Sequence, residues 1–491
     1  SEYIEKIQYY DGLGRPEQLN QRGVSGNNLD LISLQEYDSF GRETAAWLPA
    51  EYPSEGNYID PVTLKEIATQ NDDKPYSLPV YEASPTGRIT AQYGPGADWH
   101  DNKKAILTGY LTNNNTDSLR CIYYHAQGYG TNIILVKKFN YYPEGSLFVT
   151  RRIDEDSNRS YEFMNKRGQV VLTRQINNDG INDTYYVYDI YGNLCYVLPP
   201  LAANSAELGD DSNTLKHYAH LYKYDTKNRC IWSRLPGCEP VKYIYDKADR
   251  LIFSQDGEQD SRGEWLYTVS DKLGREVLRG FITETPPDIS NEHVTAEFYS
   301  NDMDPYVLTC NVYFNISNPE IMTFYDNNYY LHSMYTPSVN LDYIDKAGYG
   351  KRCQNNKGRI ANQLVAYKDT NGYNKWLNIV YYYDDKGRVI QSKSMNHLGG
   401  IDEEYTAYNF TGQPLKKLRV HSATGKTTQT ETYTYQYDHV LRLIKTVHQL
   451  QEGTATPKPA VILAENTYDE LGRLKTNKKN NNANLTSTYG Y

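Results

Sequence analysis

Three pairs of neighbouring acids could supply the two carboxylates that acid–base catalysis needs. A pair that flanks one glycosidic bond can act as acid and as base or nucleophile in sugar hydrolysis. Adjacent residues of a strand, however, point to opposite faces, so two neighbours cannot flank one bond. We therefore interpret the acids as solvated side chains and expect no catalytic residue among them. The pairs are Asp210/Asp211, Asp384/Asp385 and Glu403/Glu404.

Metal, thiol and phosphate motifs give no stronger signal. The histidines lack HxH and HExxH spacing, and His217 and His220, three residues apart, are only a weak metal signal. No GxSxG, Walker or dinucleotide fingerprint is found, and the GPG at Gly94 reads as a turn. We expect no metal, no cofactor and no enzymatic activity. The six cysteines form no CxxC pair and are expected to be scattered buried thiols: Cys121, Cys195, Cys230, Cys238, Cys310 and Cys353.

Charge and hydropathy exclude further classes. A net charge of −10 argues against a nucleic-acid partner, which requires a basic stripe. No apolar run is long enough to span a membrane, and no secretory signal is found. Ser1 in place of Met suggests a processed or trimmed terminus, so export remains open.

A recurring turn is the feature around which the chain is organised. In YDDKGRVI, from Tyr383 to Ile390, Asp384 suits the first position of a type I turn because its carboxylate can accept the turn's own N–H groups. Gly387 can take the positive φ of a three-residue hairpin loop. The flanking tyrosines and aliphatics have strand composition. The motif therefore predicts a β-hairpin, and its recurrence predicts a repeat architecture.

The motif recurs from the first residues to the last. Gly41, Gly274, Gly387 and Gly472 are expected at positive φ, and Asn228 and Asp249 to replace glycine there. Leu441 suits this conformation poorly, so we expect its turn to be rebuilt. Weaker copies begin at Ser84, Asn165, Asn355 and Asn409, and FYDNNYY at Phe324 resembles a copy without its glycine and arginine. The candidate structural residues are Tyr10, Asp11, Gly14, Arg15, Tyr37, Asp38, Gly41, Arg42, Tyr188, Asp189, Gly192, Tyr224, Asp225, Arg229, Tyr245, Asp246, Arg250, Asp271, Gly274, Arg275, Tyr383, Asp384, Gly387, Arg388, Tyr437, Asp438, Arg442, Tyr468, Asp469, Gly472 and Arg473.

Tyrosines two residues apart precede many of these turns. Spacing of two places both rings on one face of a strand, and we expect them to stack across strands as aromatic ladders. Exposed tyrosines could instead stack on sugar rings, so a carbohydrate-binding surface protein is the alternative. Packing or exposure of Tyr381, Tyr383, Tyr435 and Tyr437 distinguishes the two. The Y-x-Y-D pairs are Tyr186/Tyr188, Tyr222/Tyr224, Tyr243/Tyr245, Tyr381/Tyr383 and Tyr435/Tyr437.

With these motifs the chain resembles the RHS/YD-repeat family of bacterial polymorphic toxins, toxin-complex shells and teneurins. YDGLGRPEQ at Tyr10, LPG at Leu235, NHLGG at Asn396 and YNFTGQPLK at Tyr408 resemble the Bacteroidetes-type members. The resemblance implies a spiralling antiparallel sheet that closes into a hollow shell around a C-terminal toxin or effector. The RHS core and toxin that would be partners in the same polypeptide are absent from this sequence. A secreted or cell-surface bacterial protein is implied.

The expected fold is all-β, a long twisted antiparallel sheet of hairpins. Pro61 to Gln70 could form a short helix with Asp60 as its cap. The pattern stops in mid-repeat, so we expect at least one unpaired terminal strand and concentration-dependent self-association. The expected regions are 1–50, an N-terminal pair of repeats; 51–160, repeats with long insertions, Gly94 to Asn115 among them; 161–280, a repeat block; 281–350, an irregular insertion; and 351–491, a repeat block that stops before an RHS core.

Overall fold

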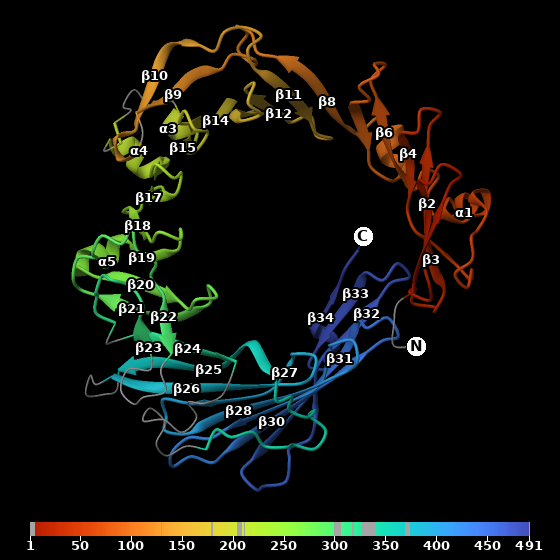
Figure 1. Cartoon of the computed structure of the whole chain (residues 1–491). Helices are drawn as coiled ribbons and strands as arrows, with labels where there is room; N and C mark the ends of the chain where they lie inside the picture. Colours follow the sequence, from red (N-terminus) through yellow and green to blue (C-terminus); the bar gives the residue numbers. More distant parts are fainter. Residues whose placement is uncertain are drawn as a thin grey trace.

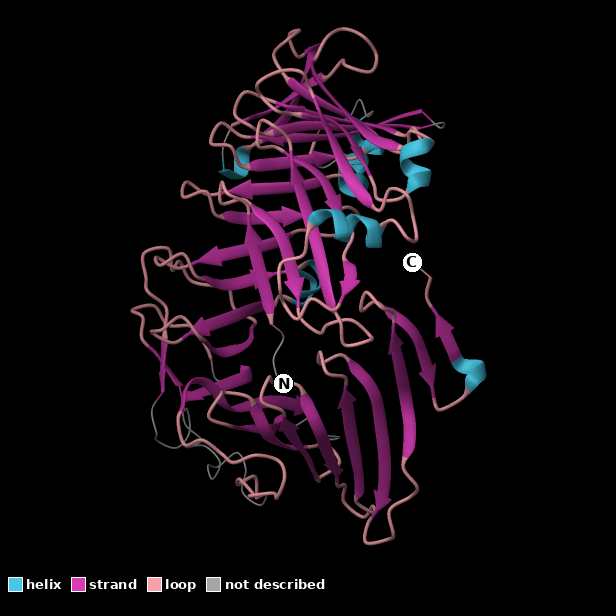
Figure 2. Cartoon of the chain, turned by 90° about the vertical axis from the view of Figure 1, so that its right-hand side faces the viewer, coloured by secondary structure: helices cyan, strands magenta, loops and turns pink. Residues whose placement is uncertain are grey.

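The computed structural model describes residues 5–128, 130–177, 180–203, 209–210, 212–298, 306–316, 319–326, 340–368 and 374–490. This part of the chain forms 34 strands, and 30 of them join in one antiparallel sheet, which confirms the all-β fold. Strands are the main regular elements in Figure 2, with only a few short helices. The helices are α1 (Pro61–Ala68), α2 (Ala97–Asp101), α3 (Pro200–Ala203), α4 (Asn213–Tyr218) and α5 (Gly257–Arg262), with 3-10 turns η1 (Gly130–Asn132) and η3 (Ala483–Leu485).

The first half of the large sheet follows chain order with one detour and one exchange near its start, where the third strand pairs with the fifth and the fourth with the sixth. The detour is the hairpin of β9 (Ile122–Gln127) and β10 (Ile134–Tyr141), which pair only with each other. The sheet strands of this half are β1 (Lys6–Tyr10), β2 (Pro16–Gln21), β3 (Asp30–Tyr37), β4 (Glu43–Trp47), β5 (Ala50–Tyr52), β6 (Tyr76–Tyr81), β7 (Ile89–Tyr93), β8 (Ala105–Thr112), β11 (Phe148–Ile153), β12 (Arg159–Met164), β13 (Val170–Asn177), β14 (Gly180–Tyr188), β15 (Leu194–Leu198), β16 (His220–Tyr224) and β17 (Cys230–Arg234).

The second half repeats the plan with a second detour, the hairpin of β22 (Ala296–Phe298) and β23 (Tyr306–Leu308). Its sheet strands are β18 (Val241–Tyr245), β19 (Leu251–Gln255), β20 (Trp265–Ser270), β21 (Glu276–Ile282), β24 (Pro319–Asp326), β25 (Asn356–Lys368), β26 (Asn374–Tyr383), β27 (Val389–Met395), β28 (Ile401–Tyr408), β29 (Pro414–His421), β30 (Gln429–Tyr437), β31 (Leu443–Glu452), β32 (Val461–Tyr468), β33 (Leu474–Lys479) and β34 (Thr486–Thr488).

Each recurring turn introduces a one-residue bulge. The strand register shifts at the tyrosine before the turn, as at Tyr188, Tyr245, Tyr383 and Tyr437. A bulge closed by a residue at positive φ is the geometry that a three-residue hairpin loop demands, and it increases the local twist. The same turn repeated along the chain therefore bends the sheet in one sense.

Insertions cover one face of the sheet. The β9–β10 hairpin with α3 and α4 buries residues such as Phe163 and Tyr196, and Leu64 of α1 packs on Ile32 and Leu34. In Figure 1 the β9–β10 hairpin, α1 and α5 lie on the outer side of the curved band of strands. The hydrophobic core therefore lies on the outer face, and Tyr224 and Tyr325 of the recurring tyrosines also pack against it. The opposite face is here called the inner face.

The sheet bends into an almost complete ring whose first and last repeats lie next to each other (Figure 1). The imidazole Nε2 of His439, in a C-terminal turn, lies 2.6 Å from the carbonyl oxygen of Gly23. Gly26 lies in van der Waals range of the backbone of Asp469, since a Cβ built on it would lie 3.6 Å from that carbonyl oxygen. The loop between β2 and β3 is thus in contact with two turns more than 400 residues later in the chain.

Three expectations about local structure were wrong. Leu441 takes φ = 67° and its turn keeps the standard hydrogen bonds, so it is not rebuilt. The stretch from Gly94 to Asn115 is not only loop, because it contains α2 and the sheet strand β8. Asn355 forms only part of the expected turn: its side chain accepts the backbone N–H of Lys357, but the backbone N–H of Gly358 donates to the carboxylate of Asp326, which follows β24's last tyrosine.

The expected helix and terminal edges are confirmed. α1 begins at Pro61 after Asp60, although the Asp60 side chain makes no capping bond. β1 pairs only with β2 and β34 only with β33, so within the described residues each terminal strand has one edge without a strand partner. None of the described helices is long and apolar enough to cross a membrane.

Candidate functional site

The carboxylate of each recurring aspartate organises its own turn. In the turn after Tyr245, one oxygen of Asp246 accepts the backbone N–H groups of Ala248 at 2.9 Å and Arg250 at 3.0 Å. The other accepts Nε of Arg250 at 2.9 Å. The carboxylate of Asp246 thus holds both the turn's backbone and the guanidinium of Arg250. Such charge-assisted hydrogen bonds are stronger than those between neutral groups. The same Asp–Arg ion pair occurs at Asp11/Arg15, Asp38/Arg42, Asp225/Arg229, Asp271/Arg275, Asp384/Arg388, Asp438/Arg442 and Asp469/Arg473.

These contacts lower the pKa of several of the aspartates. Burial alone would raise the pKa of Asp246, but the hydrogen bonds from Arg250 and Val294 outweigh burial and bring it below its usual value. The pKa of Asp11 is lowered chiefly by the backbone N–H of Arg15. A lowered pKa keeps the carboxylates charged at neutral pH, which suits an ion pair and not a proton donor.

Every predicted glycine has the predicted conformation. Gly41, Gly274, Gly387 and Gly472 have φ between 79° and 82°, and Gly14 and Gly192 are also positive. Asn228 and Asp249 replace glycine at 63° and 62°. The predicted positive φ is therefore confirmed at each of these positions.

A second contact links most of the turns to the preceding one. The guanidinium of Arg15 lies 4.3 Å from the ring centre of Tyr37, and the Tyr37 hydroxyl donates to the carbonyl of Pro16. Arg229 stacks on Tyr245 in the same way at 5.0 Å. Cation–π contact and hydrogen bond together fix one hairpin on its predecessor. The hydroxyl bond to the residue after the preceding turn recurs at Tyr81, Tyr188, Tyr224, Tyr245, Tyr325, Tyr383, Tyr408, Tyr437 and Tyr468.

The predicted tyrosine-on-tyrosine ladders are therefore wrong. Among the described residues, no ring contact joins two tyrosines of the Y-x-Y-D pairs. At Tyr245 and Tyr383 the ring lies beside the guanidinium of Arg229 and Arg359 instead. The face of an aromatic ring attracts a cation more strongly than it attracts the face of another ring, because the ring quadrupole makes the face negative. Of the four tyrosines chosen as a test, Tyr383 is buried and Tyr381, Tyr435 and Tyr437 are half-buried. The rings are packed, as a structural role requires.

The predicted turns all lie along one edge of the sheet, here called the turn rim. It carries the turns that follow Tyr10, Tyr37, Tyr188, Tyr224, Tyr245, Ser270, Tyr383, Tyr437 and Tyr468, since each joins the same ends of consecutive strands.

Sequence reasoning missed a further copy at Asp154, whose carboxylate accepts the N–H groups of Asp156 and Asn158. Its signal was an aspartate followed by Ser157 at φ = 70° in place of glycine.

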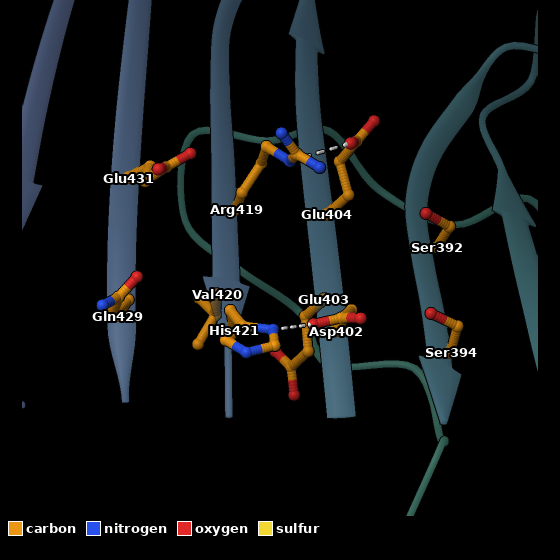
Figure 3. Close-up of a pocket in the computed structure, with 10 residues that line it drawn as sticks. All are labelled: Ser392, Ser394, Asp402, Glu403, Glu404, Arg419, Val420, His421, Gln429 and Glu431. Carbon is orange, nitrogen blue, oxygen red and sulfur yellow. Dashed lines mark hydrogen bonds and ion pairs between the residues drawn. The ribbon is translucent and has the colours of Figure 1, made fainter. Parts of the chain in front are cut away.

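The inner face also carries a polar groove of about 440 Å³ across β27 to β30 (Figure 3). Cross-strand register places polar residues in two rows, Ser392, Glu404, Arg419 and Glu431 in one and Ser394, Asp402, His421 and Gln429 in the other. Nδ1 of His421 contacts the carboxylate of Asp402, and Lys417 and Arg419 pair with Glu404. Pairs of polar residues two apart on four strands were the available sequence signal.

The acid pairs behave as strand alternation predicts where they are described. Both acids line the groove, but Glu404 pairs with Lys417 and Arg419, whereas Glu403 pairs with Lys393 and accepts the hydroxyl of Tyr405 at 2.5 Å. Burial lowers the pKa of Lys393, which is only 1% exposed. Asp384 belongs to a turn and Asp385 is exposed. Asp211 lies outside the described residues.

The sequence predicts no metal site and no disulfide among the histidines, cysteines and acids. Within the described ranges no group of three or more His, Cys, Asp or Glu side chains could hold a metal ion. All six cysteines are free thiols, as expected, although only Cys121 and Cys195 are buried. His217 hydrogen-bonds its own helix at Asn213.

By strand pairing and turn chemistry, the chain is an all-β repeat protein built from hairpins in one antiparallel sheet. Its residues 1–112 match a family described as a domain of unknown function, DUF6443. A crystal structure titled TcdB2-TccC3-TEV is similar at 12% identity and a TM-score of 0.45, covering 97% of this chain and 22% of that one. TcdB2-TccC3 without its hypervariable C-terminal region gives 13% and 0.44, with the same coverage.

This chain therefore spans about a fifth of the length of those proteins. A comparison with curated proteins finds no match. At TM-scores below 0.5, the fold assignment rests on the chain's own strand pairing.

Proposed function

We propose that this chain is a segment of the wall of a protein shell, which helps to enclose a C-terminal toxin or effector of a longer polypeptide. The observation that carries the proposal is the single sheet of 30 strands bent so far that His439 meets Gly23. A sheet that returns to its own start encloses space, which a binding module or an open scaffold does not need.

The two faces of the sheet support this role. Insertions bury the outer face, so the wall has its own core and does not need a cargo to fold. The inner face carries half-buried tyrosines and the polar groove. Such a surface can lie against water or a loosely folded polypeptide, because aromatic area and polar tips coexist on it.

We propose a non-enzymatic role for the same reason. The recurring aspartates and arginines are bound to each other, and in the groove Glu404 faces lysine and arginine and Asp402 faces histidine. A general acid needs a raised pKa and a nucleophile needs a neighbouring base. The partners implied are an RHS core and the effector of the same polypeptide, in a secreted or cell-surface bacterial protein, without nucleic acid.

Protection from proteolysis tests the proposal. In the longer gene product, the segment after residue 491 should be cleaved more slowly while attached to this wall than after its release. Val440→Asp, which puts a charge at a buried position (8% exposed) beside the Gly23 contact, should open the ring and abolish protection. The matched control is Val461→Asp at a 49% exposed site. Equal cleavage of attached and released segments would refute enclosure, and glycan turnover by residues 1–491 would refute the non-enzyme claim.

Carbohydrate binding is the second candidate, and the polar groove favours it. Carboxylates and an arginine beside Tyr433, whose hydroxyl donates to Glu431 at 3.0 Å, are the side chains that sugar hydroxyls and rings use. Titration of the protein with a glycan panel tests it. Binding that Glu404→Ala and Arg419→Ala each weaken would support this role, and no saturable binding would reject it.

A further inference from the structure

Four of the nine recurring turns on the turn rim carry an exposed apolar side chain at the tip, which is the second residue after the aspartate. Two others carry Lys227 and Lys386 there. Leu13 is 79% exposed, Phe40 84%, Tyr191 65% and Leu273 76%. Leu13 and Phe40 belong to consecutive hairpins, so they lie roughly 10 Å apart, two strand spacings. Exposed apolar residues repeated at one position of a motif are unusual for a solvated rim.

Two turns of the same rim differ, and they are the ones in contact with the chain's own start. His439 reaches Gly23, and the tip of its turn, Val440, is 8% exposed. Asp469 meets Gly26, and the tip of that turn, Leu471, is half-buried. The element in contact with both turns is the β2–β3 loop on the opposite edge of the sheet. The molecule thus contains one example of turns of this rim in contact with a loop of the other rim.

The other rim carries more loops of this kind, here called the loop rim. The β2–β3 loop reads GVSGNNL from Gly23, and the β29–β30 and β31–β32 connections read SATGKTT from Ser422 and GTATPK from Gly453. All are small, polar and rich in Gly, Ser, Thr or Asn, and most of their residues are exposed. Short side chains let backbone approach an apolar tip closely.

From this we infer that the free tips are a docking surface for a second copy of this chain, which places its loop rim over the turn rim and repeats the intramolecular contact between copies. The two surfaces differ, so the association is head-to-tail and does not close at a dimer. The number of copies in each assembly therefore depends on the protein concentration. The inference is independent of what the shell encloses.

Light scattering over a concentration series tests it. The average mass should rise at least roughly twofold with concentration, because each copy offers both surfaces. Leu13→Ser with Phe40→Ser should lower the association constant at least ~10-fold, since exposed apolar anchors carry such contacts. The control Tyr313→Ser removes an equally exposed aromatic (81%) from an outer loop and should change nothing.

Mixing variants distinguishes head-to-tail docking from other contacts. A loop-rim variant, Thr427→Glu with Thr456→Glu, should also be monomeric by itself. Its mixture with the Leu13→Ser/Phe40→Ser variant should form dimers but no larger species, because one intact surface of each kind remains. A monomer at every concentration would overturn the inference. So would association that survives the tip substitutions and disappears with Ser487→Pro, because the β34 edge would then be the contact.

Discussion

Asp246 is the recurring aspartate whose removal should cost most, and Asp246→Asn is the sharpest test of the turn chemistry. Its side chain is fully buried, and the ion-pair distance to Arg250 is 2.5 Å. It also accepts the backbone N–H of Val294 at 3.1 Å, which fastens an outer insertion to the turn. Asparagine has the same shape and keeps one oxygen for Ala248 and Arg250, but presents an amide to the guanidinium.

The magnitude follows from what is left unpaired. A hydrogen bond to a charged group contributes about 1.5–3 kcal/mol, and a broken buried ion pair costs about 3–5 kcal/mol. Because the side chain of Arg250 is 24% exposed and can regain water, we expect a loss of ~2–3 kcal/mol. Asp385→Asn is the matched control, since Asp385 is exposed beside a turn and should change stability by less than about 0.5 kcal/mol.

The pH dependence gives the reasoning a second test. The pKa of Asp246 is lowered in the folded protein, so its contribution is complete above the unfolded value of about 4 and is lost as pH falls through the folded value. The stability gap between wild type and Asp246→Asn should therefore narrow below about pH 4. Urea unfolding measures the gap, and hydrogen exchange at Ala248, Arg250 and Val294 localises it. An unchanged free energy of unfolding at neutral pH would refute the turn-anchor role.

Three other substitutions or probes follow from single contacts. Leu441→Gly should stabilise the protein by about 1 kcal/mol by relieving a positive φ, and a stability loss in urea unfolding would contradict this. Tyr245→Phe should cost about 1 kcal/mol for its hydroxyl bond, whereas Tyr191→Phe at an exposed tip should cost nothing; equal effects would deny the link between turns. A thiol reagent should modify Cys238 in the folded protein but Cys121 only on unfolding, because burial also raises the pKa of the Cys121 thiol; rapid labelling of Cys121 would disprove its burial.

The turns were predictable from sequence because their chemistry is local. Asp384, Gly387 and Arg388 lie within five residues, and turn geometry alone decides which types fit. Leu441 shows the limit of the same rule: an intact set of turn hydrogen bonds holds even a poorly suited residue at positive φ. At Leu441 the hydrogen bonds of the turn outweigh the preference of leucine for negative φ.

What depends on register or on distant sequence was not predictable. The carboxylate of Asp326 accepts the backbone N–H of Gly358, 32 residues later, so the aspartate and the glycine of this motif are distant in the sequence but adjacent in the structure. The polar groove needed the register of four strands before its residues could be placed together. The contact of His439 with Gly23 depends on the accumulated twist of nearly the whole sheet, so no single segment of the chain could predict it.

The preference for tyrosine over phenylalanine, 49 against 10, follows from the links between turns. At Tyr245 the ring fills space beside the strand, its face receives Arg229, and its hydroxyl reaches the carbonyl of Cys230. Phenylalanine could supply the first two contacts but not the third. The third contact is the one that fixes register, because a carbonyl is a point along the strand whereas a ring face tolerates sliding. A sheet of 30 strands that must return to its own start accumulates every error of register, so a hydroxyl at each hairpin limits the error where it arises.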